Sequence, residues 1–241
     1  MSAEGPAVRG LDQVPAGPLG PGVTVAEMLN DAQGCRGLHQ RRLGFADGAR
    51  LAGTTGGRGE AWYVITGTGS LATERAGSLA LAPGTAVWLE PGTGYDARAD
   101  GELAVLAVTV LAVTVRAGSE CAGPTRPVVR LEECEPERTG DREFRVLLSE
   151  GLTITQFAGL IPPGRAATHH HTYDEVVHVL AGQGVVHLGD AGPLAGTPIG
   201  PGTSIYLPPL QPHCLENTGA EPLRVLGVFH PAGSPAAKQA S

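Results

Sequence analysis

The sequence lacks the features that mark several large classes of protein. It has no basic stripe and a formal net charge of −7, so we expect no nucleic-acid partner. No apolar run reaches the length of a transmembrane helix, so we expect no membrane contact. The longest candidate, residues 103–115, is interrupted by threonines and predicts a buried strand pair or one long strand. The segment MSAEGPAVRG also lacks the basic-then-apolar pattern of a signal peptide, so we expect a cytoplasmic protein.

Cysteine is scarce, and none of the cysteines is spaced as a CxxC pair. They are Cys35, Cys121, Cys134 and Cys214. In a reducing cytosol they would stay as thiols, and packed, unreactive cysteines are the expected outcome. Cys214 draws attention only because it follows a candidate metal ligand.

Glycine (36 residues) and proline (20 residues) are abundant and punctuate short apolar runs rich in Val, Leu, Ile and Thr. This pattern predicts an all-β barrel or sandwich with few short helices. Residues 23–32 are the expected helix, with Thr24 as its N-cap. The expected organisation is a flexible segment (1–22), a first barrel (23–116), a linker (117–127), a second barrel (128–231) and a disordered tail (232–241).

Two blocks of the chain repeat each other. Glu60, six mostly apolar residues and Gly67 recur 115 positions later as Glu175, VVHVLA and Gly182. The following LAPGTAVWLEPGTGYDA matches IGPGTSIYLPPLQPHCL, aligned on PGT. The conserved order and spacing predict a duplicated β unit, and two packed barrels would bury more apolar surface than either alone.

The second block holds a candidate metal site. On a strand His169 and His171 would point to one face, with Cα atoms roughly 6.6 Å apart. Glu175 can join them if the chain turns back near residues 172–174, and His213 follows a proline-rich turn. Three imidazoles and one carboxylate suit a single divalent ion, with Fe(II) favoured and Mn(II), Ni(II), Co(II) or Zn(II) as alternatives.

These segments resemble the two motifs of the cupin superfamily, G-x5-HxH-x3,4-E-x6-G and G-x5-P-x-G-x2-H-x3-N. The second block departs from them in the spacing after Gly164 and in Leu210, which replaces the usual glycine. Neither departure removes a ligand. The resemblance implies two tandem jelly-roll β-barrels, a bicupin, with the metal inside the second barrel.

The first block keeps one of the four ligands. Thr54 and Gly56 stand at the HxH positions, Tyr95 stands at the last histidine, and only Glu60 remains. One carboxylate will not hold a transition metal tightly, so we expect the first barrel to be metal-free, structural or binding an organic ligand.

Three functions stay open for a bicupin with one intact site. The first is an Fe-type dioxygenase, such as the quercetinase-like members of the superfamily. The second is a non-redox isomerase, cyclase, decarboxylase or lyase, in which a metal polarises a carbonyl. The third is a non-catalytic protein that binds a small ligand. Metal content and oxygen uptake would separate them.

Other candidate residues lie near the expected ligands. Tyr173, Tyr206 and His230 are candidate acid–base or substrate-orienting groups, while Gln156 and Gln211 are candidate donors to a ligand or substrate. The expected partner is a small-molecule substrate, and the expected assembly is a monomer or homodimer. The composition, with arginine favoured over lysine, is typical of a bacterium of high GC content.

Overall fold

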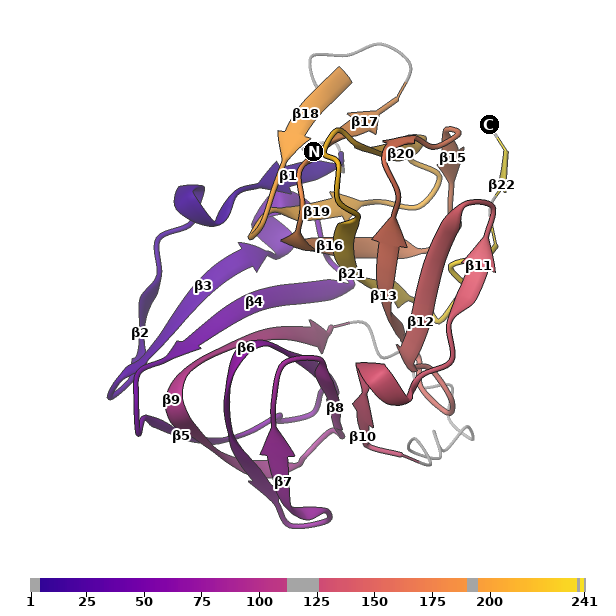
Figure 1. Cartoon of the computed structure of the whole chain (residues 1–241). Coiled ribbons are helices and arrows are strands. Elements are labelled where there is room, and N and C mark those ends of the chain that lie inside the picture. Colours follow the sequence, from indigo (N-terminus) through magenta and orange to yellow (C-terminus); the bar gives the residue numbers. More distant parts are fainter. Residues whose placement is uncertain (1–4, 112–125, 190–194, 238, 241) are drawn as a thin grey trace.

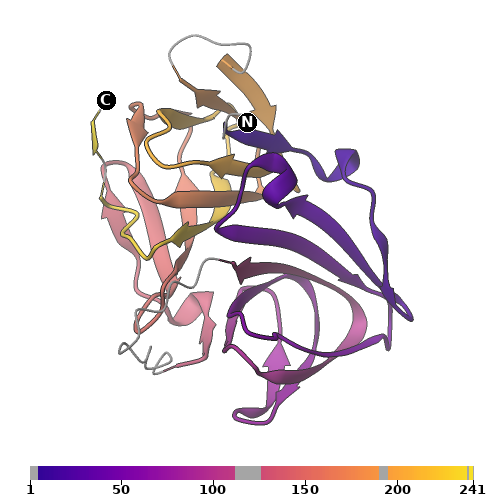
Figure 2. The same ribbon diagram turned by 180° about the vertical axis from the view of Figure 1, so that it is seen from behind.

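The protein is an all-β molecule built from two barrels. A computed structural model describes residues 5–111, 126–189, 195–237 and 239–240, and these contain strands and short 3₁₀ helices. Figure 1 shows the two barrels packed against each other, with the N-terminal half in indigo and magenta and the C-terminal half in pink to yellow. The view from behind in Figure 2 shows the same two-part arrangement. The prediction of two tandem barrels is therefore confirmed.

The first barrel is one strongly bent antiparallel sheet in the order β10-β8-β6-β9-β4-β3-β2, with β5 paired to β9 and β7 paired to β6. Its strands are β2 (Gly17–Gly20), β3 (Val23–Leu29), β4 (Leu38–Phe45), β5 (Arg50–Thr54), β6 (Glu60–Thr73), β7 (Gly77–Leu81), β8 (Thr85–Leu89), β9 (Gly94–Val110) and β10 (Val128–Arg130). Residues 94–110 form one long strand, which contains residues 103–110 of the apolar run; residues 112–115 of that run lie outside the described residues.

The second barrel is built from two facing sheets, in the orders β1-β19-β16-β21-β13-β12-β11 and β18-β17-β20-β15-β22, with β14 paired to β20. Its strands are β1 (Ala7–Arg9), β11 (Glu137–Thr139), β12 (Arg142–Leu148), β13 (Thr155–Ile161), β14 (Gly164–Arg165), β15 (His169–His170), β16 (Asp174–Ala181), β17 (Gly184–Leu188), β18 (Ala195–Ile199), β19 (Ser204–Leu207), β20 (His213–Asn217), β21 (Leu223–His230) and β22 (Gln239–Ala240).

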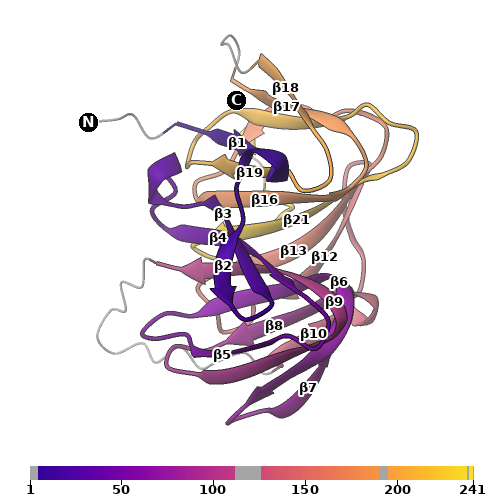
Figure 3. The ribbon, with the colours of Figure 1, turned by 90° about the vertical axis from the view of Figure 1, so that its left-hand side faces the viewer.

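Each barrel receives one strand from the other half of the chain. Strand β1 pairs with β19 of the second barrel, and β10 pairs with β8 of the first barrel. A 3₁₀ helix follows each of these strands, η1 (Leu11–Gln13) after β1 and η3 (Leu131–Glu133) after β10. The side view in Figure 3 shows β1 beside β19 and β10 beside β8. The repeat therefore extends into both exchanged strands, which cross the expected domain boundaries.

The core follows from the alternation of apolar side chains on these strands. One cluster fills the first barrel around Trp62 and Leu43, and another fills the second barrel around Val179 and Ile205. The largest cluster lies between the barrels and takes Leu38 and Val108 from one side and Val176 from the other. Because both faces of the strands between the barrels are buried, the two halves form one packed body.

One expectation about local structure was wrong. Residues 23–29 form strand β3 instead of a helix, because Val23, Thr24 and Val25 pair with β4, and only η2 (Asp31–Gln33) is helical nearby. The segment expected to be flexible contains β1, η1 and β2. In the tail, the N–H of Gly233 donates to Thr155 Oγ1 (3.2 Å), and β22 pairs with β15. Most of the expected linker lies outside the described residues.

No helix among the described residues is long and apolar enough to span a bilayer. Cys35, Cys134 and Cys214 are free thiols, and Cys121 lies outside the described residues.

Candidate metal centre

The expected ligands converge inside the second barrel. His169 on β15 is the direct cross-strand partner of His213 at the start of β20, so the sheet register alone brings these two imidazoles together. The alternation of buried and half-buried side chains along residues 169–171 turns His171 to the same side and His170 away. Ligand atoms of the three histidines lie within 4.8 Å of one another, a spacing that one ion can bridge.

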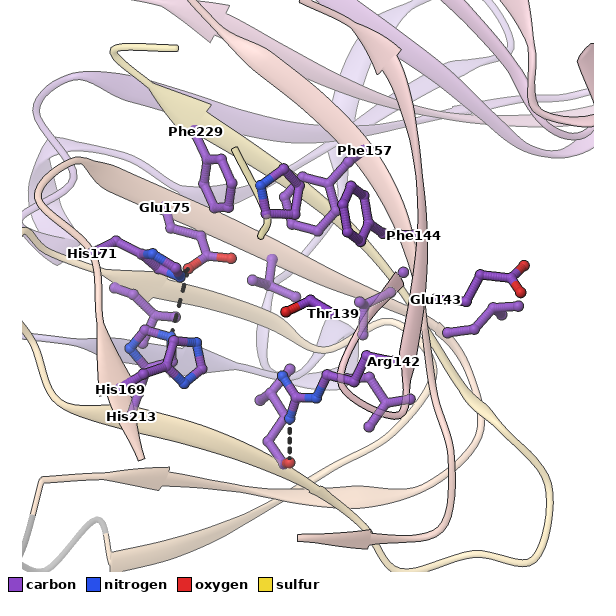
Figure 4. A pocket seen from close by; sticks show the side chains of 18 residues that line it. Thr139, Arg142, Glu143, Phe144, Phe157, His169, His171, Glu175, His213 and Phe229 are labelled. Carbon is purple, nitrogen blue, oxygen red and sulfur yellow. Dashed lines mark hydrogen bonds and ion pairs between the residues drawn. The ribbon is translucent and has the colours of Figure 1, made fainter. Parts of the chain in front are cut away.

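Glu175 reaches the same point from strand β16. The chain passes from β15 in one sheet to β16 in the facing sheet, so the carboxylate approaches the histidines from that second sheet. Its Oε2 atom lies 3.7 Å from the Nε2 atom of His171 and 3.7 Å from that of His213. Figure 4 shows the carboxylate directed at these rings.

Backbone carbonyls fix the orientation of the three imidazoles. The Nδ1 atoms of His169, His171 and His213 lie 3.1, 3.1 and 2.8 Å from the carbonyl oxygens of Ala167, Ala237 and Gln211. A carbonyl oxygen can only accept, so each Nδ1 carries the proton and each Nε2 is left as a lone-pair donor. This is the tautomer that a histidine needs in order to bind a metal through Nε2.

The electrostatics of the cluster fit a bound cation. Burial raises the pKa of Glu175 to about 8, although the guanidinium of Arg142 pulls it down. Burial lowers the pKa of His213 to about 3, so this ring is neutral at pH 7. The Oε2 atom of Glu175 is buried and has no hydrogen-bond partner among the described residues. A buried, unsatisfied carboxylate oxygen facing neutral imidazoles is a costly arrangement that a divalent ion would satisfy.

A strained turn presents His213. Leu210 has φ of 64°, in the left-handed region, and its side chain is 60% exposed. This is the position at which the sequence departs from the glycine of the cupin motif, so the backbone keeps a conformation that favours glycine although the side chain has changed. The Leu210 N–H donates to the carbonyl of His171 (2.7 Å), which ties this turn to the other ligand segment.

Sequence reasoning missed Arg142, which lines the same cavity as the four ligands. It begins strand β12, and its Nη2 donates to the carbonyl of Leu215 (3.0 Å). No carboxylate pairs with it among the described residues, and burial lowers its pKa, with nearby Asp141 opposing. Strand register in the structure aligns Arg142 with Val23, a core valine of the first barrel, so the charge is particular to the second barrel.

The cavity is small and largely apolar apart from these groups. Its volume is about 70 Å³. Phenyl rings form one side of it, and Thr139 faces the histidines across it (Figure 4). The rings belong to Phe144, Phe157 and Phe229. The structure thus combines a candidate cation site, one guanidinium and a wall that excludes water.

The candidate acid–base residues lie outside the lining of this cavity. Tyr173 stacks on the ring of His171 (centroids 5.0 Å apart, 11° between planes) and donates to the carbonyl of Ser234 (3.1 Å). Tyr206 donates to Asp174 Oδ1 (2.7 Å) in the core between the barrels, and His230 pairs with Asp174 across β16 and β21. Tyr173 is therefore placed to orient the imidazole of His171, whereas Tyr206 and His230 lie away from the cavity.

Of the two glutamines that were candidate donors, Gln211 contacts a candidate ligand and Gln156 does not. Gln211 contributes its carbonyl to His213, as described above. Gln156 is fully buried, and its amide has no hydrogen-bond partner among the described residues. It is absent from the lining of the metal-site cavity. Its repeat equivalent, Gln40, is buried and unsatisfied in the same way.

In the first barrel an arginine faces the remaining glutamate. Glu60 forms an ion pair with Arg41 and accepts hydrogen bonds from Thr109 Oγ1 (2.8 Å) and Trp62 Nε1 (2.9 Å). Tyr95 packs edge-on against Trp62. Two further candidate ligand positions, residues 54 and 56, are exposed. Arg41 occupies the repeat position that Phe157 holds beside the metal site of the second barrel. A guanidinium therefore supplies the positive charge that Glu60 faces.

Comparisons with known proteins agree with this fold and site. Residues 158–229 match the family model Cupin_2, described as a cupin domain. An uncharacterized protein of Methanocaldococcus jannaschii, MJ1618, is 34% identical over 84 residues, which are 34% of this chain and 64% of that relative. The matched region thus spans under two thirds of that relative's length.

Solved structures resemble almost the whole chain. A variant of Bacillus subtilis oxalate decarboxylase superposes with a TM-score of 0.76 at 16% identity, covering 97% of this chain and 78% of the other. Escherichia coli protein YlbA superposes with a TM-score of 0.78 at 15% identity, covering 94% and 91%. Another study of the decarboxylase concerns its Mn(II) centres. The second barrel thus contains a region that matches the cupin domain model and holds a three-histidine cluster, and the chain shares its fold with these structures.

Proposed function

We propose that the protein is a metal-dependent, non-redox enzyme that acts on a small carboxylate, as a decarboxylase or related lyase. The observation that carries this proposal is Arg142, a partly buried guanidinium without a carboxylate partner among the described residues, in the cavity that holds the four ligands. Such a group recognises a carboxylate through charge-assisted hydrogen bonds. The resemblance to oxalate decarboxylase supports the same chemistry.

The size of the cavity limits the substrate. A volume of about 70 Å³ corresponds to roughly two or three water molecules, so a carboxylate of about two to four carbons is the expected class. Short dicarboxylates and 2-oxo acids belong to this class. A large aromatic substrate, which a flavonol-type dioxygenase would need, does not fit without rearrangement.

His169, His171, Glu175 and His213 would hold the ion, and Mn(II) and Fe(II) both suit this donor set. When bound, the ion supplies Lewis-acid stabilisation of negative charge on a substrate oxygen. Arg142 holds and orients the carboxylate of the substrate. The phenylalanine rings exclude water, which strengthens these charge interactions and protects a developing carbanion from premature protonation.

We propose in addition that the first barrel has lost its metal and serves as a scaffold. The support is that Glu60 is satisfied by Arg41, Thr109 and Trp62, whereas Glu175 Oε2 has no such partner among the described residues.

The test uses untagged protein, metal analysis, and a panel of oxalate, malonate, oxaloacetate and pyruvate. We expect about one ion per chain, release of CO₂ and no oxygen uptake. Arg142→Met should raise KM roughly tenfold or more while the metal content stays unchanged, because the lost hydrogen bonds contribute about 1.5–3 kcal/mol. The matched control is Arg138→Met, an exposed arginine on neighbouring β11 that should leave KM unchanged.

Two outcomes would overturn the proposal. Stoichiometric oxygen uptake would favour the dioxygenase. An easily exchanged, substoichiometric metal with no turnover on any of these acids would favour a non-catalytic ligand-binding protein.

A further inference from the structure

A second and larger cavity lies at the junction of the two barrels. Its volume is about 810 Å³, compared with about 70 Å³ for the cavity at the metal site. Its lining comes from β6, the turn before β8 and η3 on one side, and from β12, β13, β16 and β21 on the other. A volume of this size accommodates an organic molecule of ordinary metabolite size.

The lining of the cavity is positive in an acidic protein. Three arginines (Arg130, Arg145 and Arg224) and two glutamates (Glu132 and Glu143) line it, a formal charge of 3 − 2 = +1, although the whole chain carries a net charge of −7. Arg145 is held in place, because its Nη1 donates to the carbonyl of Cys134 (2.6 Å) and its Nη2 lies 3.5 Å from Glu143. The guanidinium groups of Arg130 and Arg224 have no hydrogen-bond or ion-pair partner among the residues that the structure describes.

A polar group and an apolar floor complete the cavity. Tyr63 is only 3% exposed and lines it, and burial raises the pKa of this phenol although Arg224 opposes the shift. The hydroxyl therefore stays protonated and can donate a hydrogen bond. Ile65, Leu131 and Leu180 add apolar surface. Guanidinium groups beside apolar walls favour a ligand that is partly anionic and partly hydrocarbon.

A comparison of the two halves of the repeat shows which of these arginines have no charged equivalent in the other half. Strand register aligns Arg145 with Ala26 and Arg224 with Ala104. Both alanines are buried, at 2% and 5% exposure. At the corresponding junction on the other side of the molecule, these two positions therefore carry no charge.

The third arginine also differs from its counterpart. Arg130 corresponds to Arg9, since each ends the strand that is exchanged between the halves. Arg9 Nη1 donates to two consecutive carbonyls of β3, at 3.2 and 3.4 Å. Arg130 makes no such bond among the described residues, so its guanidinium donors remain available at the cavity that it lines.

We propose that this cavity is a binding site for an organic carboxylate with an apolar body, held by Arg130 and Arg224 and separate from the metal site. Five residues line both cavities, so only the sheet of β12, β13 and β21 separates them: Glu143, Phe144, Gly159, Leu160 and Val225. The junction site is nevertheless distinct, because it shares neither Arg142 nor a metal ligand with the smaller cavity.

The probe is 2-naphthoate, whose fused rings exceed the small metal-site cavity, and the neutral control is 2-naphthamide. Calorimetry on the full-length, metal-loaded protein should give saturable binding of naphthoate at one site per chain. The amide should bind at least tenfold more weakly. Arg130→Ala and Arg224→Ala should each weaken naphthoate binding roughly tenfold, and both positions are exposed, so folding should be unaffected.

The matched control is Arg75→Ala, which removes an exposed arginine outside this lining and should leave the affinity unchanged. Equal binding of acid and amide would overturn the proposal, as would absence of saturable binding. Affinity that is lost in Arg142→Met but kept in Arg130→Ala and Arg224→Ala would place the probe at the metal site and overturn it too.

Discussion

Loss of the ion pair between Arg41 and Glu60 in the first barrel should lower the free energy of unfolding by a measurable amount. Glu60 is 3% exposed, and Arg41 is the only cationic partner that the described residues give it. Removing one member of a buried pair typically costs about 3–5 kcal/mol, because the other charge stays buried without compensation. Thr109 and Trp62 still donate to Glu60, so Arg41→Met should cost about 3 kcal/mol, the lower end of that range.

A double-mutant cycle with Arg41→Met and Glu60→Gln tests this reasoning. The double variant should recover most of the loss, because the amide oxygen can accept from Trp62 Nε1 while the amide NH2 donates to the Thr109 hydroxyl, and neither bond needs a counter-charge. Thermal unfolding is the assay, and about 3 kcal/mol corresponds to a fall in Tm of roughly 6–12 °C for a chain of this size. Metal content should not change in either variant. A cost below about 1 kcal/mol for Arg41→Met, or additive effects in the cycle, would refute the view that the arginine acts as the internal cation.

Three further outcomes follow from the second barrel. Burial lowers the pKa of His178 to about 4 from 6.5, so the unfolded chain binds more protons between these values, and stability should fall by roughly 2–3 kcal/mol from pH 7 to pH 4. His178→Asn can keep the 2.9 Å bond to Ser204. In denaturation curves measured from pH 7 to pH 4, this variant should lack the fall in stability due to His178, and a fall that is merely shifted in pH would contradict the assignment. Truncation after Gly233 removes the carbonyl bound to His171 Nδ1, and chelator competition should show a metal affinity about 10–100-fold lower; unchanged affinity would contradict this role. Leu210→Gly should raise the free energy of unfolding by about 1 kcal/mol, since it relieves the left-handed φ of 64°, and a lower Tm would count against strain there.

The clustering of the candidate ligands could be predicted because their geometry is local. His169 and His171 share a face by the alternation of a strand, and Glu175 needs one short turn to rejoin them. His213 needed the closed barrel, which the cupin motif implied and the pairing of β15 with β20 provides. The duplicated β unit was equally visible, because the spacing from Glu60 to Gly67 repeats in the second half.

The rest depended on contacts between distant parts of the chain. Arg142 lies well before the ligands in sequence, and only strand register places it beside them. Residues 23–29 became a strand because β4 offers a pairing edge, which composition does not reveal. The Pro- and Ala-rich tail gave no signal for order, yet its main-chain carbonyls bind His171 and Tyr173. Main-chain acceptors are nearly independent of residue type, so sequence reasoning has no means of finding them.

The exchange of β1 and β10 between the halves has a consequence for how the chain can be cut and reassembled. A fragment that ends before β10 would leave the edge of β8 without its partner, and the complementary fragment would lack β1 at the edge of β19. Neither half is thus a self-sufficient unit, and gene fragments split between them should produce soluble protein only when expressed together. The N-terminal half therefore cannot be deleted without loss to the C-terminal barrel, because its sequence supplies a structural strand of the barrel that holds the three-histidine cluster.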